Sequence, residues 1–218
     1  MAPGYDPIIL DLDGTVIDTV ELIRVSFRYA VTTVLGQELP DEVIMAGVGQ
    51  PLMTQMRALS AEHAQELHDV YREHNHRVHD ELIRGYEGME AALGRLKAAD
   101  RRLAIATSKS ADTTAMGFRS LPELRAYFDV VVTASDSGAH KPSPEPLLLA
   151  LERLGASAKR AIYIGDAPVD IEAGRAAGLA TAAVLWGMFS RESLLTARPD
   201  FVLATPADMV DLCLEGGR

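Results

Sequence analysis

The sequence predicts an α/β fold, in which a Rossmann-like, doubly wound parallel sheet carries an inserted α-helical domain. Three observations lead to this prediction: short uninterrupted apolar runs, helical patterns between them, and one long early interval with helical texture alone. The chain has 218 residues, of which 48% are hydrophobic and 24% charged, as expected for a folded protein with a core. This length suits one large domain or one domain with a sizeable insertion.

The expected strands are short apolar runs that lack the alternation of a half-exposed sheet. Strands that are apolar on both faces suit a parallel sheet covered by helices on both sides. The runs lie at residues 8–10, 103–106, 130–132, 161–164 and 182–185, with 201–203 as one more candidate.

Helical spacing of apolar residues separates several of these runs. It occurs at residues 90–99, 144–154 and 170–177, and the last pattern stops before Gly178, which suits a helix C-cap. Strands and helices that alternate in this way indicate a doubly wound domain.

The interval from about Thr19 to Arg84 breaks the alternation, because it contains no convincing strand. Helices are expected there at residues 21–35, 40–45, 52–59 and 61–83. An insertion of this size can form a small domain of its own. We therefore expect a core domain made of residues 1–17 and 86–218, and a helical domain made of residues 18–85.

The formal net charge of −10 limits the partners that we expect. An acidic chain repels nucleic-acid phosphates and anionic membranes, so neither is an expected partner. A small phosphate substrate would also be repelled, and its site would need local cations. We expect either a monomer or a homodimer.

The cysteine count and the N-terminus bear on location. Cys213 is the only cysteine, so no intrachain disulfide can form, which fits a reducing compartment. The first residues lack the basic and apolar regions of a signal peptide. We expect a cytoplasmic protein.

The sharpest feature is an acidic loop that follows the first expected strand, with the sequence Asp11-Leu12-Asp13-Gly14-Thr15. Ligands of open α/β sheets bind outside the carboxyl ends of the strands. Two carboxylates there can share one hard cation, or one can attack an electrophile while the other moves a proton. The alternative is an Asp-rich turn that caps a helix.

Three more segments place polar residues after later strands: Thr107-Ser108-Lys109, His140-Lys141-Pro142, and Gly165-Asp166 with Asp170. Each has an ordinary explanation, namely a helix cap, an exposed lysine or a capping carboxylate. The carboxyl ends of parallel strands meet at one edge of the sheet, so all four segments are expected to converge there. Lys141 could then supply positive charge to a phosphoryl group, and Asp166 could complete a metal site.

These motifs resemble those of the haloacid dehalogenase (HAD) superfamily, and the resemblance covers nearly the whole chain. It implies Asp11 as the nucleophile and Asp13 as the general acid and base. It implies that Thr107 and Lys141 hold the phosphoryl group and that Asp170 supports the site. A magnesium ion is implied, bound by Asp11, Asp166 and the backbone carbonyl of Asp13. The helical insertion resembles the cap domain of the first class in this family.

The acid at Asp13 narrows the activity that the resemblance implies. Relatives that cleave carbon–halogen bonds lack an acid there, so a phosphatase is expected that forms a phospho-aspartate on Asp11. A phosphomutase similar to β-phosphoglucomutase, or a retired enzyme fold that only binds, are the alternatives. Ala167 departs from the polar residue that relatives often carry.

The stretch from Tyr71 to His76 resembles a subgroup that hydrolyses inorganic pyrophosphate, with close relatives that act on phosphoglycolate. Pyrophosphate is the favoured substrate. The residues expected to contact the substrate are Gly14, Thr15, Ser108, Lys109, Gly49, Gln50 and Arg72. Of these, Gly49 and Gln50 lie in a loop that resembles the substrate-specificity loop of the family. The alternative for this loop is a plain connection between helices. The alternative for Arg72 is a charge on the surface of a long helix. The spacing of the five cap histidines does not favour a metal site.

Overall fold

The predicted sheet is present in the structure, a computed structural model that describes residues 4–216. Six strands are all parallel and lie in the order β5-β4-β1-β6-β7-β8. Their bounds are β1 Ile8–Leu10, β4 Leu103–Ala106, β5 Val130–Val132, β6 Ile162–Gly165, β7 Ala180–Val184 and β8 Phe201–Leu203. The chain order reverses at β1, which lies between β4 and β6, and ligands of such sheets bind at this reversal.

Helices cover both faces of the sheet, which explains why the strands are apolar on both sides. The side chains of Ile8 and Leu10 belong to the cluster on the face of α5 (Met89–Ala98) and α11 (Pro206–Glu215). Ile9 belongs to the opposite cluster, and α8 (Glu145–Arg153) and α9 (Pro168–Ala176) pack there. All three β1 side chains are fully buried.

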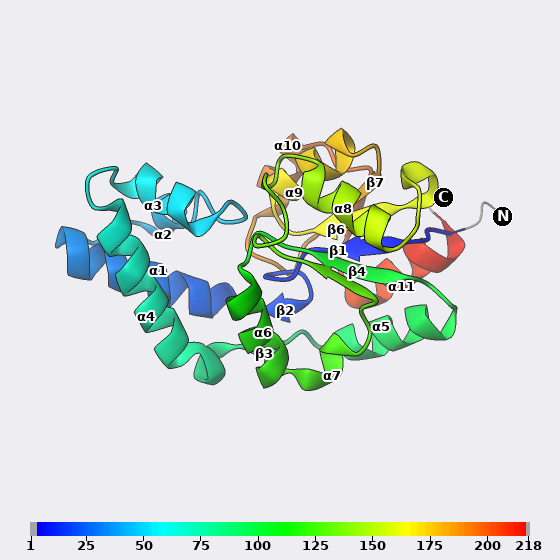
Figure 1. Cartoon of the computed structure of the whole chain (residues 1–218), viewed down its shortest axis with the longest axis horizontal. Helices are drawn as coiled ribbons and strands as arrows, with labels where there is room; N and C mark the ends of the chain where they lie inside the picture. The colour runs from blue at the N-terminus through cyan, green and yellow to red at the C-terminus, as the bar shows by residue number, and fades with distance from the viewer. Residues whose placement is uncertain (1–3, 217–218) are drawn as a thin grey trace.

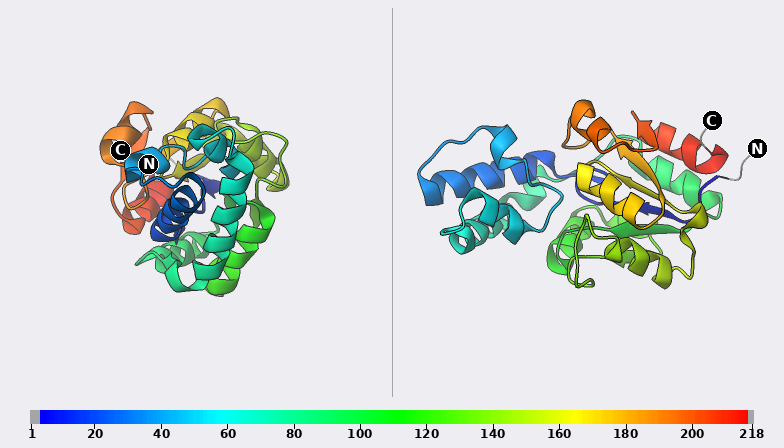
Figure 2. Two further views of the ribbon diagram at one scale, coloured as in Figure 1. Left: turned by 90° about the vertical axis from the view of Figure 1, so that its left-hand side faces the viewer. Right: turned by 90° about the horizontal axis from the view of Figure 1, so that it is seen from above.

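The helical insertion forms a separate layer beyond the carboxyl ends of the strands (Figure 1). It consists of α1 (Val20–Leu35), α2 (Asp41–Ile44), α3 (Leu52–Leu59) and α4 (Ala64–Leu82). These helices bury their own hydrophobic cluster, whose centre includes Phe27, Met56 and Leu67. Figure 2 shows the same arrangement from two further sides. We refer to this layer as the cap.

The two segments that join the cap to the sheet domain pair with each other. Ile17–Asp18 (β2) and Arg84–Gly85 (β3) form a two-stranded antiparallel ribbon. The expectation of no strand up to Arg84 was therefore wrong at its end. Two-residue strands are too short to carry a readable period, so neither segment indicates this ribbon on its own.

Several helices of the sheet domain were not predicted from the sequence. They are α6 (Ala111–Ser120), α7 (Pro122–Arg125), α10 (Arg191–Thr196) and α11. Helix α6 contains two threonines and a glycine, which are weak helix formers. Its start is fixed locally, because the Ser110 side chain accepts a hydrogen bond from the backbone N–H of Thr113.

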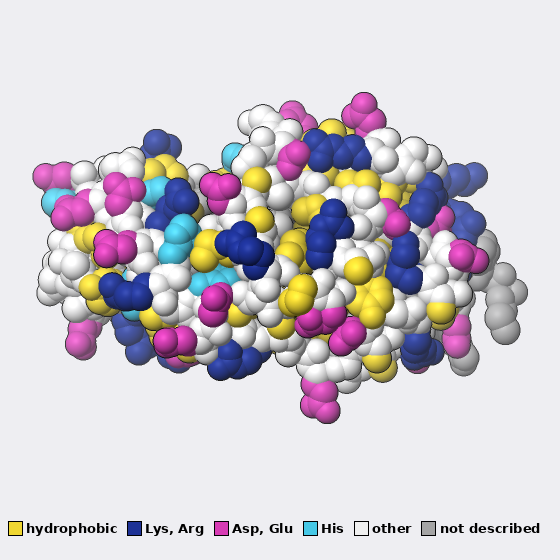
Figure 3. All heavy atoms as spheres, turned by 60° about the horizontal axis from the view of Figure 1, so that its bottom comes forward, with side chains coloured by type: hydrophobic (Ala, Val, Ile, Leu, Met, Phe, Trp, Pro, Cys, Tyr) yellow, Lys and Arg dark blue, Asp and Glu magenta, His cyan; other side chains and the backbone are white. Residues whose placement is uncertain are grey.

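One face of the molecule shows a mixed charge distribution. On the side seen in Figure 3, Lys and Arg side chains are interspersed with Asp and Glu, and histidines gather over the cap. Within residues 4–216, no helix has the length and apolar character required to cross a bilayer.

Candidate active site

Three buried carboxylates meet at the carboxyl edge of the sheet. Asp11 follows β1, Asp166 follows β6, and Asp170 lies in the first turn of α9. One oxygen from each lies within 4.8 Å of the others. Their exposed fractions are 5%, 2% and 0%, so water screens their mutual repulsion poorly.

Lys141 supplies the buried positive charge in this cluster. Its Nζ lies 2.6 Å from Asp170 Oδ1 and 2.9 Å from Asp11 Oδ1, and its side chain is 1% exposed. Its Nζ also donates to the hydroxyl of Tyr163 at 3.0 Å. The surface alternative for Lys141 is therefore wrong.

The pKa values of the cluster follow from burial and charge. Burial first, then the charges of Asp170 and Asp13, raise the pKa of Asp11 to about 7, although Lys141 opposes this. Burial, and then the charges of Asp170 and Asp11, raise the pKa of Asp166 well above its usual range. Burial disfavours the charged form of Lys141, but Asp11 and Asp170 outweigh it and raise its pKa.

The cluster has the donor set of a hard cation such as magnesium, which prefers carboxylate oxygens. Asp11 Oδ1 is buried and has no aligned hydrogen bond from any described donor, although Lys141 Nζ lies within ion-pair distance. A cation at this position would bind that oxygen and lower the repulsion among the three acids. The residues present therefore fit the expected ion.

Glycines allow the backbone to approach these acids closely. A Cβ added to Gly14, whose φ is +76°, would lie 2.2 Å from Asp166 Oδ2. A Cβ added to Gly165 would lie 2.4 Å from the Asp170 Cγ. Any side chain at either position would displace a carboxylate, so the site requires glycine there.

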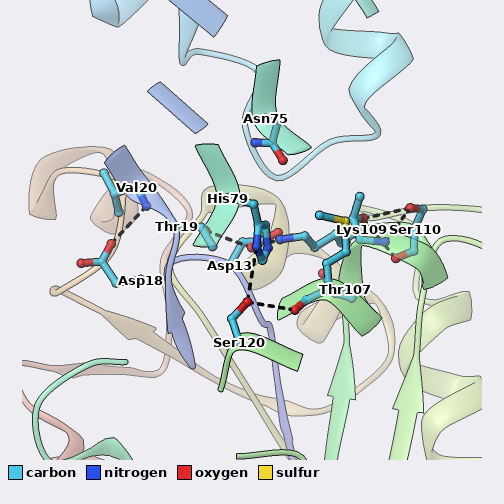
Figure 4. A network of polar contacts seen from close by, with 12 residues as sticks. Asp13, Asp18, Thr19, Val20, Asn75, His79, Thr107, Lys109, Ser110 and Ser120 are labelled. Atoms are coloured by element: carbon cyan, nitrogen blue, oxygen red, sulfur yellow. Dashed lines mark hydrogen bonds and ion pairs between the residues drawn. The ribbon is translucent and has the colours of Figure 1, made fainter. Parts of the chain in front are cut away.

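Asp13 lies apart from the three-acid cluster. Its Oδ1 accepts hydrogen bonds from Lys109 Nζ at 2.7 Å and from Thr19 Oγ1 at 2.9 Å. Figure 4 shows Asp13 between these two partners. The side-chain cluster thus consists of Asp11, Asp166 and Asp170. The binding of magnesium by the backbone carbonyl of Asp13 stays a prediction.

Thr107 and Ser108 follow β4, as expected. Thr107 is 4% exposed, and its Oγ1 accepts from the backbone N–H of Lys109 at 3.2 Å. Ser108 Oγ donates to the carbonyl of Gly49 at 2.8 Å. The loop that contains Gly49 therefore contacts the sheet domain directly, which a plain connection within the cap would not need to do.

A cavity of about 270 Å³ lies between the cap and the carboxyl edge of the sheet. Asp11, Asp13 and Asp166 line it from the sheet domain, and Gly49, Gln50 and Arg72 line it from the cap. Thr107, Ser108 and Lys109 line it as well, so the cavity brings together most of the expected site.

Gly14 and Thr15 are the exceptions among the expected substrate contacts. Neither Gly14 nor Thr15 is among the described residues that line the cavity. Thr15 is fully buried, and its Oγ1 donates to Asp166 Oδ1 at 3.3 Å. Both residues lie against Asp166, since the Gly14 backbone approaches its carboxylate closely and Thr15 bonds it.

The cap histidines do not form one cluster, although His68 and His76 both line the cavity. His79 is 1% exposed, and its Nδ1 lies 2.8 Å from Asp80 Oδ1 and 3.5 Å from Ser120 Oγ of α6. His74 stacks on Tyr29. Within residues 4–216, the group found with metal-ligand spacing is the acidic cluster alone.

Tyr163 also contacts the buried charges of the site, although no motif in the sequence indicates it. Besides accepting from Lys141, its hydroxyl lies 2.9 Å from the carbonyl of Ala106 and 3.2 Å from Asp170 Oδ1. It holds the lysine and the acid together beneath the cluster. Its one sequence signal was a hydroxyl within an otherwise apolar buried strand.

We expect the stability of the metal-free protein to fall as pH rises from about 4 toward about 7. The folded pKa of Asp11 is raised to about 7, whereas an unfolded aspartate has a pKa of about 3.9. Between these values the native state holds a proton that the unfolded chain has lost, so the free energy of unfolding decreases with pH. Thermal unfolding in EDTA across this range measures the effect.

The matched comparison uses Asp11→Asn and Asp136→Asn. The first variant should weaken this pH dependence without abolishing it, because the pKa of Asp166 is raised as well. The second should keep it, because hydrogen bonding to Thr133 first, and Arg153 further, lowers the pKa of Asp136 to about 2. Magnesium should raise the melting temperature more at pH 7.5 than at pH 5, since it competes with protons for the acids. An equal shift at both pH values would contradict the assignment.

Comparisons with known proteins agree with this geometry. Residues 8–184 match the family described as haloacid dehalogenase-like hydrolase. The pyrophosphatase PpaX of Bacillus velezensis is 38% identical over 205 residues, which are 94% of each chain. That of Bacillus pumilus is 36% identical and covers 93% of this chain and 94% of its own.

Solved structures also resemble this chain. That of a predicted phosphatase from Clostridium acetobutylicum has a TM-score of 0.84 at 26% identity, and covers 95% of this chain and 97% of its own. A predicted phosphoglycolate phosphatase from Haemophilus somnus has a TM-score of 0.79 and covers 97% and 99%, but its 20% identity shows the fold alone. The chain therefore belongs to the haloacid dehalogenase-like hydrolase family.

Proposed function

We propose that the protein is a magnesium-dependent phosphatase that acts on a small phosphorylated compound through a phospho-aspartate on Asp11, with inorganic pyrophosphate as its favoured substrate. The observation that carries the proposal is that Asp11 and Asp166 line one cavity, while the buried Lys141 lies 2.9 Å from the Asp11 carboxylate. The names of the PpaX relatives support the choice of pyrophosphate.

In the first step, a carboxylate oxygen of Asp11 attacks phosphorus, and the bond from phosphorus to the leaving oxygen breaks. Asp13 donates a proton to that oxygen. Asp13 lies on the cavity wall, but it is bonded to Lys109 and Thr19, so it must rotate toward the leaving group first. With pyrophosphate, the leaving group is phosphate.

In the second step, the carboxylate of Asp13 removes a proton from water, and the water oxygen attacks phosphorus. The bond between phosphorus and Asp11 breaks, and phosphate is released. Lys141 lies 2.9 Å from the nucleophilic carboxylate and offsets negative charge in both steps. Magnesium held by the acidic cluster would neutralise charge on the phosphoryl oxygens.

The cavity is lined by one cationic side chain from the cap and one from the sheet domain, which suits an anionic leaving group. Arg72 and Lys109 both line the cavity, in a chain whose net charge is −10. They would bind the second phosphate of pyrophosphate or the carboxylate of phosphoglycolate. The cytoplasmic location and the state of monomer or homodimer stay predictions of the sequence.

The test is phosphate release from pyrophosphate and from phosphoglycolate, each with magnesium and with EDTA. We expect phosphate release when magnesium is present and none in EDTA. We also expect a higher kcat/KM for pyrophosphate than for phosphoglycolate. Arg72→Ala should lower kcat/KM about 10-fold for both substrates, and mainly through KM, because it removes one charged contact. No release from either substrate would reject the proposed activity and favour a mutase or a retired fold.

A further inference from the structure

The segment Trp186-Gly187-Met188-Phe189 lies between the acidic cluster and the cap. It follows β7 and precedes α10. We call residues 186–189 the bridging segment. Its backbone contacts Asp166 and two of its side chains contact the cap, so four consecutive residues connect this acid with the cap.

The contacts with the acids centre on Asp166. The backbone N–H of Met188 donates to Asp166 Oδ2 at 2.7 Å. A Cβ added to Gly187 would lie 2.3 Å from the Cβ of Asp166. Trp186 Nε1 donates to the carbonyl of Thr15 at 3.0 Å, and Thr15 in turn bonds the other oxygen of Asp166. Both carboxylate oxygens are therefore oriented by this segment, directly or through one residue.

The contacts with the cap are apolar. Met188 and Phe189 pack against the buried cluster of the cap, although both belong to the sheet domain. Phe189 also packs against a second cluster, which is formed by residues of α9, β7 and α10. Met188 and Phe189 line the cavity as well. Met188 therefore contacts the cap through its side chain and Asp166 through its backbone N–H.

We propose that the bridging segment is a positioning element that couples docking of the cap to cation binding at Asp166. When the cap packs on Met188 and Phe189, the Met188 N–H is fixed in the direction that orients the carboxylate. Cation binding and enclosure of a phosphate under the cap then strengthen each other, and by linkage the effect is the same in both directions. The inference rests on the proposed magnesium site and its phosphate ligand.

Trp186 provides a direct readout, because it is the only tryptophan of the chain and lies in the bridging segment. Its ring is partly buried and lies edge-on to the ring of Tyr86, with 6.4 Å between the two ring centroids. The experiment titrates magnesium while the Trp186 emission is recorded, with and without inorganic phosphate. The measured quantity is the ratio of the two magnesium dissociation constants, which requires no turnover.

We expect phosphate to tighten magnesium binding by about 5-fold or more in the unaltered protein. Phe189→Ala should reduce this ratio toward one, and Phe189→Leu should retain part of it. The matched control is Leu59→Ala, which also removes a partly buried side chain from the cap cluster but lies outside the cavity lining. It should lower the melting temperature and keep the ratio.

Three results would overturn the inference: a ratio of one in the unaltered protein, an unchanged ratio in Phe189→Ala, or an equal loss in Leu59→Ala. The last would mean that general loosening of the cap explains the effect. A normal ratio in a protein that hydrolyses neither pyrophosphate nor phosphoglycolate would reject the proposed activity and leave the coupling intact.

Discussion

Asp11→Asn should lower the kcat for phosphate release by about 10³-fold or more. The amide cannot act as the carboxylate nucleophile, while its size and shape are nearly unchanged. Since Asp11 is one of three acids within 4.8 Å, removing its charge should leave the fold intact or slightly more stable. Phosphate release with pyrophosphate and magnesium measures the first effect, and thermal unfolding measures the second.

The control for Asp11→Asn is Asp136→Asn. Asp136 also follows a strand, β5, but it bonds Thr133 and Arg153 away from the cavity. The Asp136→Asn variant should retain activity close to that of the unaltered protein. Substantial turnover by Asp11→Asn, in a preparation free of other phosphatases, would remove Asp11 as the nucleophile.

Lys141→Met should lower both activity and stability. Lys141 is the buried cation beside Asp11 and Asp170, and loss of one partner from a buried ion pair costs about 3–5 kcal/mol. Loss of the charge beside the phosphoryl group should lower kcat about 10²–10³-fold. Urea unfolding in EDTA at pH 7 measures the stability, and turnover with saturating magnesium measures the activity.

Lys109→Met is the matched comparison for stability. Lys109 pairs with Asp13, and both side chains are partly accessible, at 12% and 18% exposed. Water screens this pair better, so its loss should destabilise the protein less than the loss of Lys141. If the two variants unfold at the same urea concentration, burial does not set the importance of Lys141.

The strands and the motifs that follow them could be predicted from the sequence, because each depends on local information. A run such as Ile8-Ile9-Leu10 is apolar on both faces, and a sheet covered on both sides is the arrangement that buries it. Parallel strands bring their carboxyl ends to one edge, so Asp11, Thr107 and Asp166 were expected together. The helices of the cap followed from apolar spacing in the same way.

Helices with weak signals could not be predicted. Helix α6 depends on a cap at Ser110 and on packing of Phe118 against the sheet domain. The ribbon of β2 and β3 depends on two segments that lie more than sixty residues apart in the chain. Pairing over that distance leaves no pattern in either segment alone.

The sequence by itself determined the fold class and the set of acids, lysine and hydroxyl that surround the site, because an apolar strand and the motif that follows it are both local features of the chain. Only the tertiary structure decided which of these side chains contact one another. It placed Asp170 among the clustered acids and Asp13 on Lys109, and it turned Gly14 and Thr15 toward Asp166. It also brought Tyr163 and the bridging segment into the site. These contacts are set by packing between distant elements, and the direction of a side chain after a strand depends on neighbours that the local sequence does not specify.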